Sequence, residues 1–253
     1  MNAQALLFRF RFWIFALLYL AGFLAPWERL VRSAPAGTLW LAAATLLART
    51  HWVSLERSTV LVTAAALGAC IAGAALRVWG TAWLGAAAVQ TPVIEAAHGP
   101  GGPLVAAGPY RYLRHPLYAG SFLFALGVSI LMPPGGALFF LVALALFEMA
   151  LISGEERFLA GALGDEYRQY RQSVPPLLPG AGSRPNASAR QPRWLEALLA
   201  EIYPVGYTLC FAVLAWRYNA FLLIKCLIIC FGAAIVVRAL LAPSRPKAPA
   251  DPN

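Results

Sequence analysis

Charged residues are scarce in this sequence. Asp, Glu, Lys and Arg make up 12% of its 253 residues, well below their share in soluble globular domains, whereas hydrophobic residues make up 60%. A composition this apolar excludes an ordinary soluble domain and favours a chain that folds in a lipid bilayer. We therefore expect one domain of the all-α class, a polytopic integral-membrane helical bundle.

Metal-ligating residues are also few, and their spacing suits no metal site. The three histidines show neither HxxxH nor HExxH spacing, and no two of the four cysteines form a CxxC pair. A thiol inside an apolar segment behaves as a small hydrophobic side chain. We expect neither a metal cofactor nor a disulfide framework, because all the cysteines lie in such segments: Cys70, Cys210, Cys226 and Cys230.

Acidic residues are fewer than basic ones, 11 against 20, and the formal net charge is +9. The basic residues cluster between the apolar stretches and show no nucleic-acid recognition motif, so neither DNA nor RNA is expected as a partner. Basic segments that flank membrane helices are typical of the cytosolic side and of contact with anionic lipid headgroups. The Ala-, Arg- and Pro-rich composition is compatible with a bacterial inner membrane.

The N-terminal third contains three apolar stretches. Residues 6–27 have the length of a membrane span and are predicted to form a retained helix, because no signal-peptide cleavage site follows them. Residues 38–48 are shorter and cross a bilayer only if their helix continues through Arg49 and His51. Residues 59–79 are rich in Ala and Gly, and we expect close helix packing at their small residues Gly68, Ala72 and Gly73.

Two further helices are predicted to form a hairpin. Region 80–108 mixes apolar residues with turn formers and is expected to be an irregular connection. A helix then begins at Pro116, since proline favours the first helical position. The turn MPPGG separates it from a second helix over residues 137–152. The ends of this hairpin, His115 and Glu155, therefore return to the same side of the membrane.

Cations and carboxylates meet where the hairpin ends. The segment RYLRH supplies Arg114 and His115, and the segment EMALISGEER supplies the carboxylates. Glu148 and Glu155 are seven residues apart and share one helical face, whereas Glu156 is rotated by about 100°. A carboxylate at the depth of Glu148 is costly in a bilayer and is a functional candidate for that reason.

The same side chains also suit simpler roles. Arg111 and Arg114 suit anchors at the cytosolic headgroups, and the tyrosines of this segment suit an aromatic belt at the membrane interface. Glu156 suits an ion pair on a solvated surface. The residues taken singly leave these alternatives open, so the order of the motifs has to decide between them.

In combination and order the motifs are specific. The chain reads LVAAGPYRYLRHPLYAG, an apolar hairpin, EE, and then LGDEYRQYRQSVPPLLP. This order resembles the isoprenylcysteine carboxyl methyltransferase and phospholipid methyltransferase superfamily of integral-membrane enzymes. The resemblance covers residues 76–179 and is most specific in R-H-P-x-Y-x-G and in G-x-E-Y-x-x-Y-x-x-x-V-P.

The resemblance implies a methyltransferase that takes its methyl group from S-adenosylmethionine, bound in a cytosol-facing pocket carried by the helix hairpin. No metal is implied, because in-line methyl transfer depends mainly on alignment and desolvation. Transferred residue by residue, the resemblance implies cofactor contacts from Leu104, Val105, Tyr110, His115, Pro116, Leu117, Tyr118 and Glu155. We predict that Arg114 and Glu156, which the same motifs contain, are catalytic.

The sequence departs from the resemblance one turn before the acidic pair. Members that methylate a prenylcysteine carboxylate are similar to one another in carrying an arginine there, where this chain has Leu151. They also tend to carry a histidine where it has Gly102. Burying an unpaired charge is prohibitive, so we expect a lipid or small amphipathic acceptor that is neutral at its reacting atom, or neutralised by another cation such as Arg114. The alternatives are a prenylcysteine carboxylate acceptor and a non-enzymatic, ligand-binding scaffold.

These features divide the chain into five parts. Residues 1–75 are expected to hold the N-terminal membrane helices, 76–179 the methyltransferase core, 180–193 a polar linker, 194–241 an interfacial helix and two spans, and 242–253 a disordered tail. A cytosolic core obeys the positive-inside rule. The side on which the N-terminus lies stays open, since three spans before residue 80 would place it outside.

Overall fold

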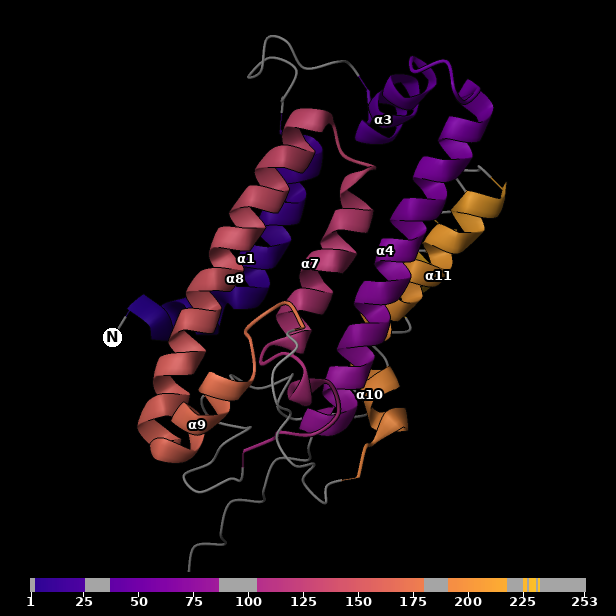
Figure 1. Ribbon diagram of the computed structural model, residues 1–253. Coiled ribbons are helices and arrows are strands. Elements are labelled where there is room, and N and C mark those ends of the chain that lie inside the picture. The colour runs from indigo at the N-terminus through magenta and orange to yellow at the C-terminus, as the bar shows by residue number, and fades with distance from the viewer. Residues whose placement is uncertain are drawn as a thin grey trace, which may run out of the picture.

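A computed structural model describes residues 3–25, 37–86, 104–179 and 191–217, with residues 225, 226, 228–230 and 232. These residues form helices joined by turns and short connections, which agrees with the predicted all-α class (Figure 1). The elements are α1 (Ala3–Leu24), α3 (Leu39–Ala48), α4 (Leu55–Leu84), the 3-10 helix η1 (Gly108–Arg111), α7 (Pro116–Ser129), α8 (Pro134–Leu163), α9 (Asp165–Ser173), α10 (Trp194–Ala200) and α11 (Ile202–Arg217).

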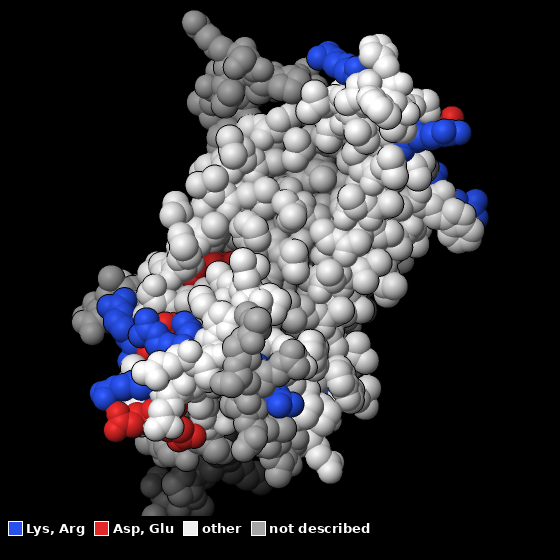
Figure 2. All heavy atoms as spheres, in the orientation of Figure 1, with Lys and Arg blue, Asp and Glu red and all other residues white. Residues whose placement is uncertain are grey.

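Among the described residues, α1, α4 and α8 are long and apolar enough to cross a membrane. The pair α10 and α11 makes a further candidate span that is bent by 72°, and α3 and α7 are shorter apolar helices. Charged side chains gather toward the two ends of the molecule, and the visible surface between them is mostly uncharged (Figure 2). The hydrocarbon core of a bilayer requires such a band. The prediction of an integral-membrane helical bundle is confirmed to this extent.

Helices α4 and α7 pack closely because glycines lie at their contact. A Cβ at Gly73 would lie 2.5 Å from a backbone nitrogen of α7, and a Cβ at Gly127 would lie 2.5 Å from a carbonyl oxygen of α4. The prediction of close packing is confirmed for Gly73. It is wrong for Gly68, whose Cβ position has no neighbour within 4 Å among the described residues, and for Ala72, which is exposed. Gly68 precedes Gly73 by five residues, about 140° around the helix, and so faces away from α7.

The second apolar stretch forms only the short helix α3. This helix ends at Ala48, and His51 then takes a left-handed conformation with φ of 62°. Ser54 caps the next helix, because its hydroxyl accepts a hydrogen bond of 3.3 Å from a backbone N–H of the first turn. The helix therefore does not continue through Arg49 and His51, which a membrane span at this position would have required. Helix α4 runs past its predicted end at residue 79 and stops before Gly85, which has φ of 105°.

The predicted hairpin is formed by α7 and α8. Helix α7 begins at Pro116, as expected, and α8 begins at Pro134. Helix α8 continues well beyond the predicted end at residue 152, so the acidic pair Glu155 and Glu156 lies within the helix rather than after it. In Figure 1, α7 stands between the pair formed by α1 and α8 and the helix α4.

The C-terminal part was predicted to be an interfacial helix followed by two spans, and the structure has α10, a bend of 72° and then α11. Helix α10 packs against α4, and the backbone N–H of Arg193 donates to the carbonyl of Ala82 at 2.8 Å. The bend between α10 and α11 places Glu201 between them. The predicted 80–108 connection, the polar linker, the last membrane span and the C-terminal tail lie largely or wholly outside the described residues.

Candidate active site

The segment before α7 is held in place by α9 and the residues that follow it. The backbone N–H groups of Arg114 and His115 donate to the carbonyls of residues 175–176 at 2.9 and 3.0 Å. The hydroxyl of Tyr170 donates to the carbonyl of Tyr110 at 2.7 Å. These bonds bring the R-H-P motif and the G-x-E-Y-x-x-Y motif together at one end of the bundle, as the hairpin predicts.

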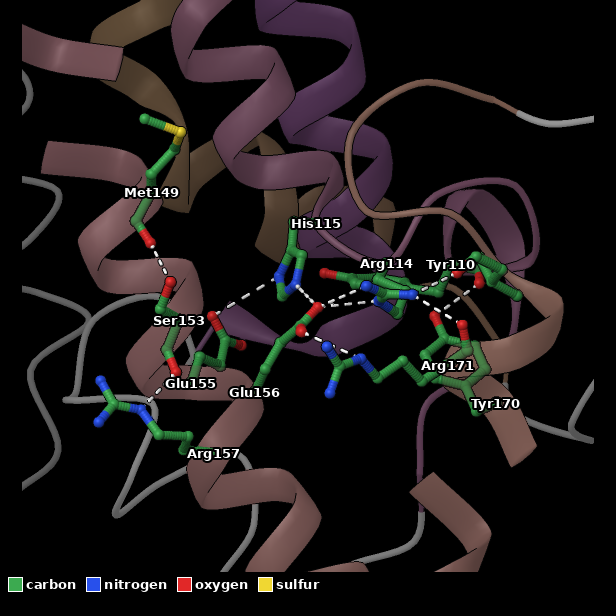
Figure 3. A network of polar contacts seen from close by, with 11 residues as sticks. Tyr110, Arg114, His115, Met149, Ser153, Glu155, Glu156, Arg157, Tyr170 and Arg171 are labelled. Atoms are coloured by element: carbon green, nitrogen blue, oxygen red, sulfur yellow. Dashed lines mark hydrogen bonds and ion pairs between the residues drawn. The ribbon is translucent and has the colours of Figure 1, made fainter. Parts of the chain in front are cut away.

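Glu156 is the centre of a network of ion pairs (Figure 3). Its Oε1 accepts from Nε of Arg114 at 2.9 Å and lies 2.7 Å from Nη2 of the same residue. Nε2 of His115 is 3.1 Å from this oxygen, and Nε of Arg171 is 3.5 Å from Oε2. Nη1 of Arg114 donates to the carbonyls of Arg171 and Val174 at 2.9 and 2.6 Å. All three guanidinium nitrogens of Arg114 thus contact protein oxygens, and Glu156 connects α8 to the segment before α7.

Glu155 lies beside this network. Its Oε2 is 3.9 Å from Nδ1 of His115, whose Nε2 contacts Glu156, so the imidazole stands between the two carboxylates (Figure 3). His115 is buried, and its ring packs at 5.9 Å from the ring of Tyr118. Glu155 also interacts with the hydroxyl of Tyr118 and with the charge of Arg11, and it faces the adjoining cavity.

A cavity of about 170 Å³ opens beside Glu155 and is called here the first cavity. Arg114 lines it, whereas Glu156 does not. The cavity is lined by every residue for which the sequence predicted a cofactor contact: Leu104, Val105, Tyr110, His115, Pro116, Leu117, Tyr118 and Glu155. Residues 104–105, 110–118 and 155 were all predicted to contact one cofactor, and their side chains line the same cavity.

Two tyrosine hydroxyls of this cavity have no hydrogen-bond partner among the described residues. Tyr110 and Tyr167 line the cavity, and both hydroxyl oxygens are buried. Burial raises the pKa of both residues, and the nearby carboxylates of Glu155 and Glu156 raise the pKa of Tyr110 and Tyr167 respectively. Both hydroxyls therefore keep their protons at neutral pH and remain available as donors. Leaving such a donor unsatisfied costs about 1–3 kcal/mol, which a ligand with acceptor atoms would recover.

Some residues of the first cavity were not anticipated. Arg77 of α4 and Ser121 of α7 line it, as do Arg11 and Phe15 of α1. Arg77 carried a usable signal, since a lone cation inside an apolar span is expensive and is a functional candidate on that ground. The residues of α1 carried no such signal, because their place depends on which helix packs against α8.

A second, larger cavity of about 730 Å³ adjoins the first and lies among α1, α4, α7 and α11. Its wall is mainly apolar and aromatic. The two cavities share Phe15, Arg77 and Ser121, so these three residues mark the junction between them. Other residues that line the second cavity include Phe12, Tyr19, Phe124, Leu144, Glu201 and Tyr207.

Residues 65–161 match the sequence profile of the isoprenylcysteine carboxyl methyltransferase (ICMT) family. This segment of the chain is similar to that family. The segment begins within α4 and ends within α8, so it contains the hairpin and most of the first cavity. Helices α1, α3, α9, α10 and α11 lie outside it, although α1, α9, α10 and α11 supply walls of the two cavities.

Several similar proteins carry the names of two kinds of methyltransferase. Protein-S-isoprenylcysteine O-methyltransferase of Schizosaccharomyces pombe is 42% identical over 80 residues, which are 30% of this chain and 34% of that protein. Methanethiol S-methyltransferase of Mycobacterium tuberculosis is 44% identical over 70 residues, 28% of each chain. Methanethiol S-methyltransferase 1 of Bradyrhizobium diazoefficiens is 41% identical over 70 residues, 28% of this chain and 24% of that protein.

The chain spans about a third or less of the length of these three relatives. No solved structure matches the chain. The match to the family profile covers the segment around the hairpin, and the remaining helices lie outside it.

Proposed function

We propose that this protein is a membrane-embedded methyltransferase that moves a methyl group from S-adenosylmethionine to a lipid or small amphipathic acceptor. Methyltransferases of the ICMT family use this donor. The observation that carries the proposal is the first cavity, which collects the residues predicted to contact the donor around a carboxylate and two unsatisfied hydroxyl donors.

The chemistry of the donor fits the groups in this cavity. The donor carries a cationic sulfonium and an ammonium group, and Glu155 is the carboxylate that lines the cavity. Its carboxylate and ribose oxygens require hydrogen-bond donors, which the hydroxyls of Tyr110 and Tyr167 provide. Its adenine requires an apolar wall, for which Leu104 and Leu159 are placed. When bound, the donor supplies an electrophilic methyl group, and the protein's part is to align it and exclude water.

Arg114 and Glu156 were predicted as catalytic residues, and their contacts favour a positioning role. All three nitrogens of the Arg114 guanidinium group contact protein oxygens, and Glu156 lies behind the cavity wall. We assign this pair the task of holding His115 and the segment before α7 against α8. His115 and Glu155 are then left to face the donor.

The second cavity supports an acceptor that enters from the bilayer. It lies among helices that have the length and composition of membrane segments, and it meets the first cavity at Phe15, Arg77 and Ser121. A mainly apolar chamber accommodates the apolar part of an amphipathic molecule, and the polar junction receives its reacting group. Basic residues lie at both ends of the visible face (Figure 2), and Arg114, Arg168 and Arg171 at the pocket end support a cytosolic orientation, which is compatible with a bacterial inner membrane.

The test is donor binding followed by methyl transfer. The full-length protein would be purified into lipid nanodiscs, titrated with S-adenosylmethionine by calorimetry, and then incubated with methyl-labelled donor and bacterial lipid extract. We expect saturable binding and label in the organic phase. Absence of binding at millimolar donor would refute the proposal. Binding without transfer to any extract would favour the alternative of a ligand-binding scaffold.

A further inference from the structure

Arg11 of α1 lines the first cavity, although it lies outside the segment that is similar to the ICMT family. Helix α1 stands beside α8 (Figure 1). Phe8 is 3% exposed and belongs to the cluster that joins the two helices, and the ring of Phe15 packs 5.2 Å from the ring of Phe147. Arg11 comes three residues after Phe8 and four before Phe15, so it shares the face of α1 that meets α8.

Arg11 has an acidic neighbour in the cavity. Glu155 of α8 and Tyr118 of α7 line the same cavity, and the charge of Arg11 interacts with both of them. The hydroxyl of Tyr118 interacts with Glu155 in turn. A guanidinium group and a carboxylate, carried by two different helices, therefore face one region of the first cavity.

The other two arginines that line this cavity in the described part of the chain are each held by a carboxylate of the protein. Nε of Arg77 lies 2.7 Å from Oε2 of Glu201, which is 1% exposed, and Nη2 of Arg114 lies 2.7 Å from Oε1 of Glu156. A ligand carboxylate would bind either arginine only by displacing its partner, and a buried carboxylate without its counter-ion is costly. Neither arginine therefore suits a negatively charged ligand group.

The donor of the proposed function carries its ammonium and carboxylate groups on one carbon atom. The groups that bind them must therefore lie close together, as Arg11 and Glu155 do. The hydroxyls of Tyr110 and Tyr167 supply hydrogen bonds to the donor's oxygens, but a carboxylate that leaves water also requires a positive charge. When the ammonium group takes Glu155 and the carboxylate takes Arg11, every charge keeps an opposite partner.

We infer that Arg11 binds the carboxylate of S-adenosylmethionine, while Glu155 binds the ammonium group beside it. This inference rests on the proposed function. It makes α1 a part of the donor site, and it makes the carboxylate a feature by which the site selects its donor. Decarboxylated S-adenosylmethionine keeps the adenine, the sulfonium and the ammonium group, so a difference in affinity between the two molecules measures what the carboxylate contributes.

The test measures the Kd of both molecules by calorimetry in nanodiscs, for wild type, Arg11→Gln, Arg11→Lys and the control Arg9→Gln. Arg9 is exposed and lies about 200° from Arg11 around the helix. We expect wild type and Arg9→Gln to bind S-adenosylmethionine about ten- to a hundredfold more tightly than the decarboxylated molecule. Arg11→Gln should lose this preference, and Arg11→Lys should keep part of it, because lysine retains the charge without the planar fork.

The two ligands separate a binding residue from a structural one. Arg11→Gln should raise the Kd of S-adenosylmethionine and leave the Kd of the decarboxylated molecule unchanged or lower, because that molecule has only positive charges for Arg11 to repel. A loss of affinity for both ligands, or the wild-type preference in Arg11→Gln, would overturn the assignment. Equal affinity of the wild type for both ligands would refute this inference alone, whereas no binding of S-adenosylmethionine would refute the proposed function.

Discussion

Nη2 of Arg114 lies 2.7 Å from Oε1 of Glu156, although 42 positions separate the two residues in the chain. Their side chains are 8% and 12% exposed. The pair therefore connects the segment before α7 to α8 in a largely buried setting. Removing one partner would leave the other charge buried without its main counter-ion, which is among the more destabilising changes in a protein.

We expect Glu156→Ala to lower the stability of the protein by about 3 kcal/mol and to weaken donor binding as a secondary effect, because His115 loses its partner. Thermal unfolding in detergent would measure the loss. The matched control is Asp165→Ala, which breaks the exposed pair with Arg168, where the side chains are 84% and 68% exposed. That variant should unfold at the same temperature as the wild type, because an exposed ion pair contributes little to stability. Equal unfolding temperatures for all three proteins would contradict the positioning role.

Glu155 and His115 should act on the donor rather than on the fold. Both line the first cavity, and neither belongs to the apolar packing between helices. Losing one charge-assisted contact typically costs about 1.5–3 kcal/mol, so Glu155→Gln and His115→Ala should each raise the Kd of S-adenosylmethionine by about ten- to a hundredfold. Calorimetry would measure this Kd, and Glu166→Gln, at an exposed position, would be the control. Wild-type affinity in both variants would remove these residues from the donor site.

The contact between α4 and α7 gives a test that is independent of any ligand. Gly73→Ala would place its Cβ 2.5 Å from backbone atoms of α7, and we expect a loss of about 1–3 kcal/mol in stability, because a backbone cannot move aside. Gly68→Ala meets no neighbour within 4 Å and should be neutral or stabilising by up to about 1 kcal/mol, through helix propensity. A thermal shift of the same sign in both variants would contradict the packing described.

The lining of the first cavity was predictable because two kinds of information agree on it. The motifs name the residues, and the length of the hairpin returns His115 and Glu155 to one end of the bundle, where they lie 3.9 Å apart. Arg77 carried a signal in its charge, whereas its partner did not. Glu201 reaches Arg77 only because the chain bends between α10 and α11, and no local pattern in WLEALLAEIYP specifies that bend.

Faces of helices were harder to predict than helices. Residues 59–79 were expected to be helical and to pack through small residues, and the helix is present. Its small residues point in several directions, however: Gly73 meets α7, Ala82 packs against Ala197 of α10, and Gly68 is exposed. The choice between Gly73 and Gly68 depends on where α7 lies, which is a tertiary fact. For the same reason the contribution of Phe15 and Tyr19 from α1 to the cavities could not be read from the sequence.

The last prediction concerns Leu151, which stands where related carboxyl methyltransferases resemble one another in carrying arginine. Leu151 is 1% exposed, packs against Phe8 and Phe147, and lines the first cavity. An arginine here would have two carboxylates on its own face of α8, since Glu148 lies three residues before it and Glu155 four residues after it.

Leu151→Arg should therefore abolish turnover of the native acceptor rather than raise it. An arginine at this position would bind Glu148 or Glu155, the carboxylate proposed for the donor, and it would also disturb the packing of α1 on α8. Wild type, Leu151→Arg and the packing control Leu151→Met would be assayed on membrane lipid extract and on a farnesylcysteine analogue, after thermal unfolding has shown which variants are folded. Leu151→Met should retain activity. Efficient carboxyl methylation of the farnesylcysteine analogue by the wild type would show that this leucine does not exclude a carboxylate acceptor.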